Sequence, residues 1–130
     1  MSVIKIIVAT HKNFIMPQDK ELYLPVHVGC EGKKDLGFQG DNTGDNISVL
    51  NPYYCELTGL YWAWKNLECD YLGLVHYRRY FTKKGVTYKD SINIDAFILD
   101  KDDIEKLLEV SNVIVPKKRK YYIETLYSHY

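Results

Sequence analysis

Alternating apolar and polar stretches predict a chain in which strands and helices follow one another. Residues 3–9 form a nearly continuous β-branched and apolar run, the pattern of a strand that is buried on both faces of a parallel sheet. Shorter apolar runs at residues 23–28, 71–75 and 112–115 predict three further strands, and Pro116 ends the last of them. Strands separated by helical stretches indicate an α/β fold with a mainly parallel sheet and flanking helices.

Three stretches show helical spacing. Asn51 and Pro52 supply a predicted N-cap and first-turn proline. The apolar residues that then recur at helical spacing are Tyr53, Leu57, Leu60, Tyr61, Trp64 and Leu67. Asp100 predicts the cap of a second helix, because an acidic residue follows three positions later. Residues 121–130 begin a third helical pattern, in which the chain stops without a capping signal.

Residues 29–47 are rich in Gly, Asp and Asn and predict a long loop. The loop contains neither G-x-x-x-x-G-K-[ST] nor G-x-G-x-x-G, so the common phosphate-binding fingerprints are absent. Residues 41–46, which include Asp41, Asp45 and Asn46, could present acceptors to a ribose or a base, although an ordinary turn has the same composition.

Polar side chains follow three of the predicted strands. They are Thr10, His11, Lys12 and Asn13 after the first strand, His76, Arg78 and Arg79 after the strand that ends at residue 75, and the basic residues 117–120 after the last. In open α/β sheets ligands bind outside the carboxyl ends of the strands, and an arginine fork matches two phosphate oxygens. These clusters therefore predict a site for a diphosphate, whereas for any one cluster a solvated loop is an equal alternative.

Two candidate residues have competing interpretations. A lone histidine such as His76 more often has a structural role, but the neighbouring arginines would keep it neutral, which suits contact with a sugar hydroxyl. Asp100 and Asp102 have the spacing of a pair that holds a divalent metal on a diphosphate. Because they open a helix, we favour capping, and no metal ligand is assigned.

Composition excludes several classes of protein. The chain has 17 basic and 17 acidic residues, so a general nucleic-acid binder is not expected. The neutrality is uneven, since residues 1–70 carry −3 and residues 71–130 carry +3. Twelve tyrosines provide aromatic surface with hydroxyl groups. The sequence favours a cytoplasmic setting. The chain has three cysteines without a C-x-x-C pair, and it lacks a long apolar run. A peripheral contact at the inner face of the membrane is left open.

Five blocks of the sequence resemble a known family. They are KIIVATHK at residues 5–12, DNIS at 45–48, ELTGLYWAWKN at 56–66, DYLGLVHYRRYF at 70–81 and VPKKRKYYIETLYSHY at 115–130. Together they resemble the family catalogued as domain of unknown function 4422. Its members are capsular and exopolysaccharide biosynthesis proteins that are regarded as glycosyltransferases related to the GT-A fold.

The resemblance implies that a sugar is transferred from a nucleotide-diphosphate donor, a uridine diphosphate sugar, to a glycan or lipid-linked acceptor. Carried over by position, Thr10, His11 and Lys12 would meet the nucleotide, and Asp45 and Asn46 the nucleoside or the donor sugar. His76, Arg78 and Arg79 occupy the place where GT-A enzymes keep their metal-binding Asp-x-Asp. Our hypothesis is that the two arginines neutralise the leaving diphosphate and take the place of a divalent cation. A divalent cation is therefore not favoured as a cofactor here.

Members of this family usually continue beyond the last helical pattern. Residues 1–130 are therefore expected to form a single GT-A-like, Rossmann-like domain that is truncated at its C-terminus and holds the nucleotide sugar. Such a chain could be inactive on its own. The alternatives are an inactive truncated fragment and a noncatalytic module that binds a carbohydrate, a nucleotide or RNA.

Overall fold

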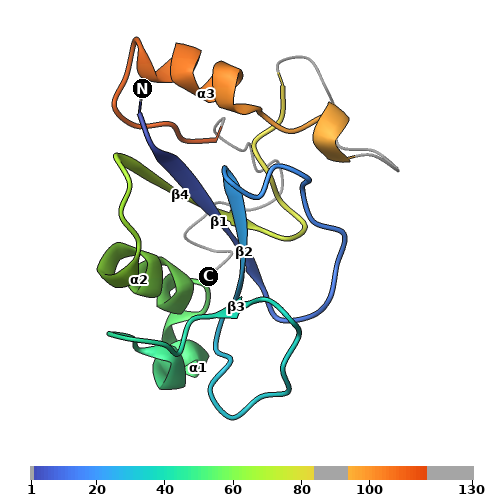
Figure 1. The fold of residues 1–130 in the computed structure, drawn as a ribbon, viewed down its shortest axis with the longest axis vertical. Helices are drawn as coiled ribbons and strands as arrows, with labels where there is room; N and C mark the ends of the chain where they lie inside the picture. The colour runs from blue at the N-terminus through green and yellow to red at the C-terminus, as the bar shows by residue number, and fades with distance from the viewer. Residues whose placement is uncertain (1, 84–93, 117–130) are drawn as a thin grey trace, which may run out of the picture.

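A parallel β-sheet forms the centre of the molecule (Figure 1). The structure is a computed structural model that describes residues 2–83 and 94–116. Within these residues the strand order is β3-β2-β1-β4, and each pair of neighbouring strands is parallel. The strands are β1 (Ile4–Thr10), β2 (Tyr23–His27), β3 (Gln39–Gly40) and β4 (Tyr71–His76). The predicted strands at residues 3–9, 23–28 and 71–75 are thus confirmed, together with the α/β class.

Each face of β1 contributes to a separate apolar core. Ile4, Ile6 and Val8 pack in one cluster, which includes Ile104 of α3 (Lys101–Leu108). Ile7 and Ala9 pack in the other, which includes Trp62 and Ala63 of α2 (Leu57–Asn66). Because successive side chains of a strand point to opposite faces, the continuous apolar run of β1 fills both cores. Helices therefore flank both faces of the sheet.

The predicted helix over residues 51–67 is wrong in its continuity and only partly right in its buried face. It is divided into α1 (Asn51–Tyr54) and α2, because Cys55 has a φ of 52°, in the left-handed region. A 3-10 turn, η1 (Ser48–Leu50), precedes α1, and Leu50 rather than Asn51 is the N-cap. The Asn51 amide instead donates to the Cys55 carbonyl at 2.8 Å.

The face of α2 that meets the sheet carries mainly small residues. Its buried residues are Thr58, Gly59, Trp62 and Ala63, whereas Tyr53 and Trp64 are 82% and 64% exposed. A Cβ at Gly59 would lie 2.5 Å from Cγ1 of Val28, so the glycine allows the helix to approach the residue that directly follows β2. Of the residues on the predicted face, Leu60 and Leu67 do pack against this core, whereas Tyr53, Leu57 and Trp64 are exposed.

The predicted strand at residues 112–115 is also wrong. Within the described part of the chain these residues pair with no strand, and Val113 and Val115 are exposed. The Ser111 hydroxyl donates to the Val113 carbonyl at 3.0 Å. This local hydrogen bond takes the place of a bond between paired strands. A short apolar run does not form a strand without a neighbour to pair with.

The capping of α3 is confirmed. The Asp100 carboxylate accepts from the backbone N–H of Asp103 at 2.8 Å, and the Asp103 carboxylate accepts from that of Asp100 at 3.0 Å. This reciprocal pair is a capping box, and Lys83 lies 3.4 Å from Asp100. The 3-10 turn η2 (Ile94–Ala96) precedes α3. In the described part of the chain, no helix is long and apolar enough to cross a membrane.

Candidate functional site

Three neighbouring strands end at the same edge of the sheet. Thr10 of β1 is in register with His27 of β2, and Ala9 is in register with His76 of β4. The carboxyl ends of the parallel strands therefore place Thr10, His27 and His76 side by side, as the strand-end rule predicts for Thr10 and His76. The hydroxyl of Thr10 is buried and donates to the Lys12 carbonyl at 2.5 Å, so this residue shapes the turn after β1.

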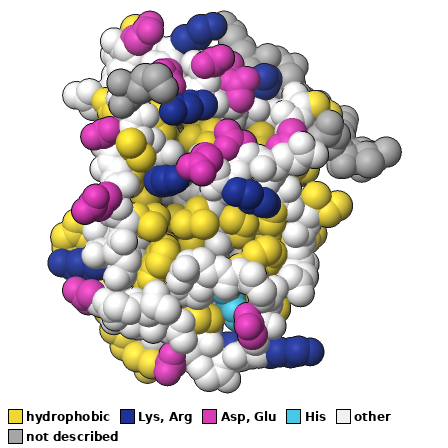
Figure 2. All heavy atoms as spheres, viewed as in Figure 1, with side chains coloured by type: hydrophobic (Ala, Val, Ile, Leu, Met, Phe, Trp, Pro, Cys, Tyr) yellow, Lys and Arg dark blue, Asp and Glu magenta, His cyan; other side chains and the backbone are white. Residues whose placement is uncertain are grey.

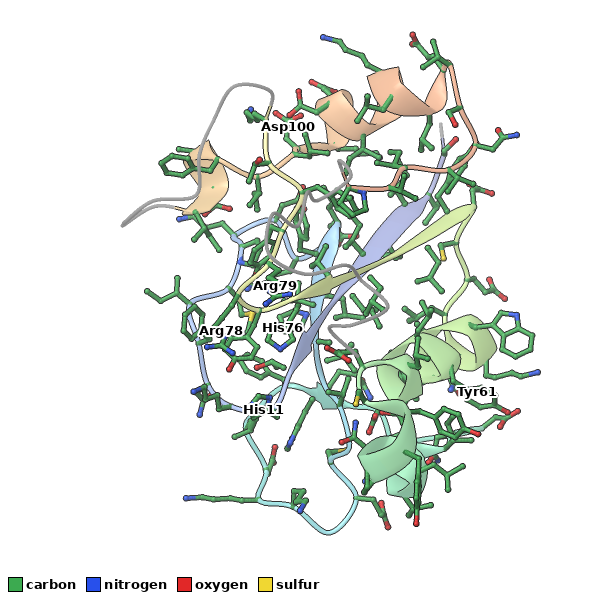
Figure 3. The ribbon with its side chains drawn as sticks, turned by 180° about the vertical axis from the view of Figure 1, so that it is seen from behind. His11, Tyr61, His76, Arg78, Arg79 and Asp100 are labelled. Atoms are coloured by element: carbon green, nitrogen blue, oxygen red, sulfur yellow. The ribbon has the colours of Figure 1, made fainter. Side chains whose placement is uncertain are left out.

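The residues after β1 and β4 pack around one buried ring, that of Tyr77. The ring centroid of His11 lies 5.4 Å from that of Tyr77, and the centroid of His76 lies 4.4 Å from it. The Lys12 ammonium is 5.9 Å from the same centroid. His11 and His76 are themselves 6.4 Å apart between centroids. In Figure 3 they lie with Arg78 and Arg79 on one side of the molecule. The structure thus brings together most of the predicted phosphate-binding residues.

A tight turn after β4 presents the two arginines. The N–H of His76 donates to the carbonyl of Arg79 at 3.2 Å, and the N–H of Arg79 donates back at 2.8 Å. The turn is made by backbone bonds, so the exposed side chains of Arg78 and Arg79 are not needed to hold it. The Arg78 guanidinium lies 5.4 Å from the Tyr77 centroid, where it gains a cation–π contact.

His76 is placed to act as a neutral imidazole. Burial is the main cause that lowers its pKa below the usual value, and the charges of Arg78 and Arg79 act in the same direction against that of Glu56. The N–H of Arg78 donates to His76 Nδ1 at 3.3 Å, which leaves the proton of the neutral ring on Nε2. The expectation of a neutral histidine is supported, with burial as the larger cause.

His27 belongs to the same edge but was not among the residues predicted from the sequence. It is 5% exposed, and burial lowers its pKa, with a contribution from the nearby charge of His11. The apolar run that predicts this strand extends through residue 28, so the sequence places His27 within the strand and not at its end. Only the alignment of β1 with β2, in which Thr10 and His27 are the last pair, shows that His27 lies at the edge of the sheet.

Stability is expected to fall as the pH drops below neutral. The folded-state pKa values of His27 and His76 are lowered, so the unfolded chain takes up protons first. The stability that these two histidines contribute is fully present above about pH 6.5, their unfolded-state pKa, and is lost as the pH falls from there through their lowered folded-state pKa values. Urea titrations at pH 7.5, 6.5 and 5.5 measure the effect, which His27→Asn should reduce. A free energy of unfolding that rises toward pH 5.5 would contradict this assignment.

Asp41 is the buried centre of the loop that follows β2. Its carboxylate accepts from the N–H of Gly29 at 2.7 Å and of Cys30 at 3.2 Å, and from the hydroxyls of Ser48 and Thr58, both at 2.6 Å. Burial alone would raise the pKa of Asp41, but these four hydrogen bonds lower it below its usual value. The sequence offered Asp41 as one of the loop residues that could face a ribose or a base, but the structure buries it among groups of the protein itself. A polar loop gives no sequence signal for a buried carboxylate.

Asp45 and Asn46 lie apart from the histidines. The Asp45 carboxylate accepts from the hydroxyl of Tyr61 at 2.9 Å, and Asn46 accepts from the N–H of Ser48 at 3.1 Å. Figure 3 shows Tyr61 on the α2 side of the molecule, away from His11 and His76. The structure therefore does not bring these two predicted residues to the edge where β1 and β4 end, and their contact with a donor stays a prediction.

The other charged candidates from the sequence, Asp100 and residues 117–120, add no described charged group to this edge. Asp100 is engaged in the capping box of α3. Residues 117–120 lie outside the described residues. Among residues 2–83 and 94–116, no group of three or more His, Cys, Asp or Glu could hold a metal ion. On the face drawn in Figure 2, basic and acidic side chains are interspersed and form no continuous basic surface.

Comparisons with known proteins agree with the sequence and the fold. The family model described as "Domain of unknown function (DUF4422)" matches residues 5–130. Among solved structures, the apo structure of the bifunctional glycosyltransferase WbbM is similar, with 41% sequence identity and a TM-score of 0.57. The match covers 67% of this chain and 16% of that one. No curated protein matches the chain. The parallel sheet with helices on both faces is consistent with a GT-A-like fold.

Proposed function

The chain belongs to the DUF4422 family, and from this premise we propose that it is the donor-binding part of a glycosyltransferase. The donor is a nucleotide-diphosphate sugar, with uridine as the nucleoside, and the acceptor is a glycan or a lipid-linked sugar of capsular or exopolysaccharide synthesis. The 41% identity to a solved glycosyltransferase supports the activity. Because the chain spans 16% of the length of that protein, the complete reaction is part of the proposal.

The observation that carries the proposal is the cationic edge at the carboxyl ends of β1 and β4. The turn after β4 presents two exposed guanidinium groups beside the imidazole of His76. The turn after β1 presents His11 and Lys12 next to the same Tyr77 ring. A diphosphate needs fixed hydrogen-bond donors and positive charge, and this edge offers both.

The residues have distinct roles in this proposal. Arg78 and Arg79 hold the diphosphate and neutralise the charge that develops on it as the bond to the sugar breaks. His76, neutral and protonated on Nε2, donates a hydrogen bond to a phosphate or sugar oxygen. His11 and Lys12 contact the nucleotide from the turn after β1. Catalysis would then depend on positioning and electrostatic stabilisation.

Uridine diphosphate is expected to stabilise the folded chain. A ligand that binds only the folded state at 100 times its Kd adds about 2.7 kcal/mol to the free energy of unfolding. A thermal-shift titration with uridine diphosphate measures this, with uridine as the control that lacks the diphosphate and an oligouridylate as the test for RNA binding. Stabilisation by the oligonucleotide alone, or by no nucleotide in a folded chain, would overturn the donor-site proposal.

A further inference from the structure

A second feature of the same edge is a cavity of about 620 Å³ between the end of β4 and the start of α2. Its volume lies in the range of pockets that hold small ligands. His76 and Arg79 line it, so it is continuous with the cationic edge proposed for the diphosphate. Leu57, Leu74 and Phe81 supply apolar lining. A cavity with a few polar groups on an apolar wall fits a ring with hydroxyls and C–H faces.

The acidic residue of this cavity is Glu56, which has no assigned role; Tyr80 lines the cavity as well. It is half-buried and directly precedes α2, yet its side chain makes no capping hydrogen bond. Within residues 2–83 and 94–116 it also forms no ion pair. Glu56 and His76 line the same cavity, and the charge of Glu56 acts to raise the pKa of His76. A half-buried carboxylate without a hydrogen-bonded partner has free acceptor positions toward the cavity.

We infer that this cavity holds the sugar ring of the donor and that Glu56 is its specificity-determining residue. The inference depends on the proposed donor site, since the sugar must follow the diphosphate held by Arg79. A carboxylate accepts two hydroxyl hydrogen bonds from a neutral sugar, and such charge-assisted bonds are the stronger kind. The same negative charge repels a sugar that carries its own carboxylate. The site therefore selects a neutral hexose over a uronic acid.

The substitution Glu56→Gln tests this inference on the chain as it is. Calorimetric titrations compare four probes: uridine diphosphate and its conjugates with glucose, galactose and glucuronate. The wild-type chain should bind at least one hexose conjugate about tenfold more tightly than the glucuronate conjugate. Glu56→Gln should reduce that ratio by about tenfold and leave the affinity for uridine diphosphate unchanged. Glu68→Gln, an exposed glutamate just beyond α2, is the matched control and should change neither value.

The outcomes separate the two proposals. If uridine diphosphate binds and the ratio of affinities is the same in Glu56→Gln and in the wild type, the sugar assignment is wrong and the donor site stands. If Glu56→Gln weakens binding of uridine diphosphate itself, Glu56 does not act on the sugar, and the inference is overturned. If uridine diphosphate does not bind the wild-type chain, the proposed function fails first. Equal melting temperatures of both variants and the wild type confirm that folding is retained.

Discussion

Replacement of Asp41 by alanine is expected to lower the free energy of unfolding by about 4 kcal/mol, because a buried and fully hydrogen-bonded carboxylate is lost. Asp41 is 0% exposed. Its removal leaves the N–H groups of Gly29 and Cys30 and the hydroxyls of Ser48 and Thr58 without their acceptor. It also opens the connection between the end of β2 and the first turn of α2, since Thr58 belongs to that turn.

Urea denaturation followed by circular dichroism measures this loss. Asp41→Asn keeps the shape but turns an amide toward donor groups, so we expect it to lose about 2 kcal/mol. Asp102→Ala is the matched control, because Asp102 is exposed in the first turn of α3, and it should change stability by no more than about 0.5 kcal/mol. A loss for Asp41→Ala that equals that of the control would show that the four bonds carry no net stability.

The sequence predicted the strands better than the helices, for a physical reason. The strand β1 is buried on both faces, so most of its residues are apolar. The strand can therefore be predicted without knowing which side chains point to which face. The helix α2 buries one face, and contact there depends on close approach at Gly59, which apolar periodicity does not register. The left-handed turn at Cys55 divides the helix and has no glycine to mark it.

The candidate site divides in the same way. His76 ends β4, and His11, Arg78 and Arg79 lie in the turns after β1 and β4, so the topology of a parallel sheet was enough to predict that they meet. His27 and Glu56 were not predicted, and Asp41 was predicted only as a possible acceptor for a ribose or base, because the roles of all three depend on burial and on partners distant in sequence. Asp41, for example, joins backbone 12 residues before it to a hydroxyl 17 residues after it. No local pattern contains that information.

The affinity for uridine diphosphate is expected to fall about a hundredfold when Arg78 and Arg79 are both replaced by alanine. Each guanidinium offers a fork of donors to phosphate oxygens, and loss of one such charge-assisted interaction costs about a factor of ten. Backbone bonds between His76 and Arg79 hold the turn, so the double variant should keep its fold. Lys33 and Lys34, exposed in the loop after β2, provide the matched control: their double replacement removes the same charge and should change the affinity less than about twofold.

The same titration distinguishes arginine from a divalent cation as the partner of the diphosphate. Two guanidinium groups supply the two positive charges that a bound divalent ion would otherwise provide, at the turn where the resemblance to GT-A enzymes places a metal-binding Asp-x-Asp. If the arginines have replaced the metal, a chelator will leave the affinity of the wild-type chain unchanged, and manganese will not restore binding to the double alanine variant. If the chelator abolishes binding of uridine diphosphate to the wild-type chain and manganese restores it, the arginines have not replaced the metal. The turn after β4 then contacts a different part of the donor. Because the two measurements use the same ligand and chains that differ only at the two arginines, the contribution of the arginines is separated from that of any added metal.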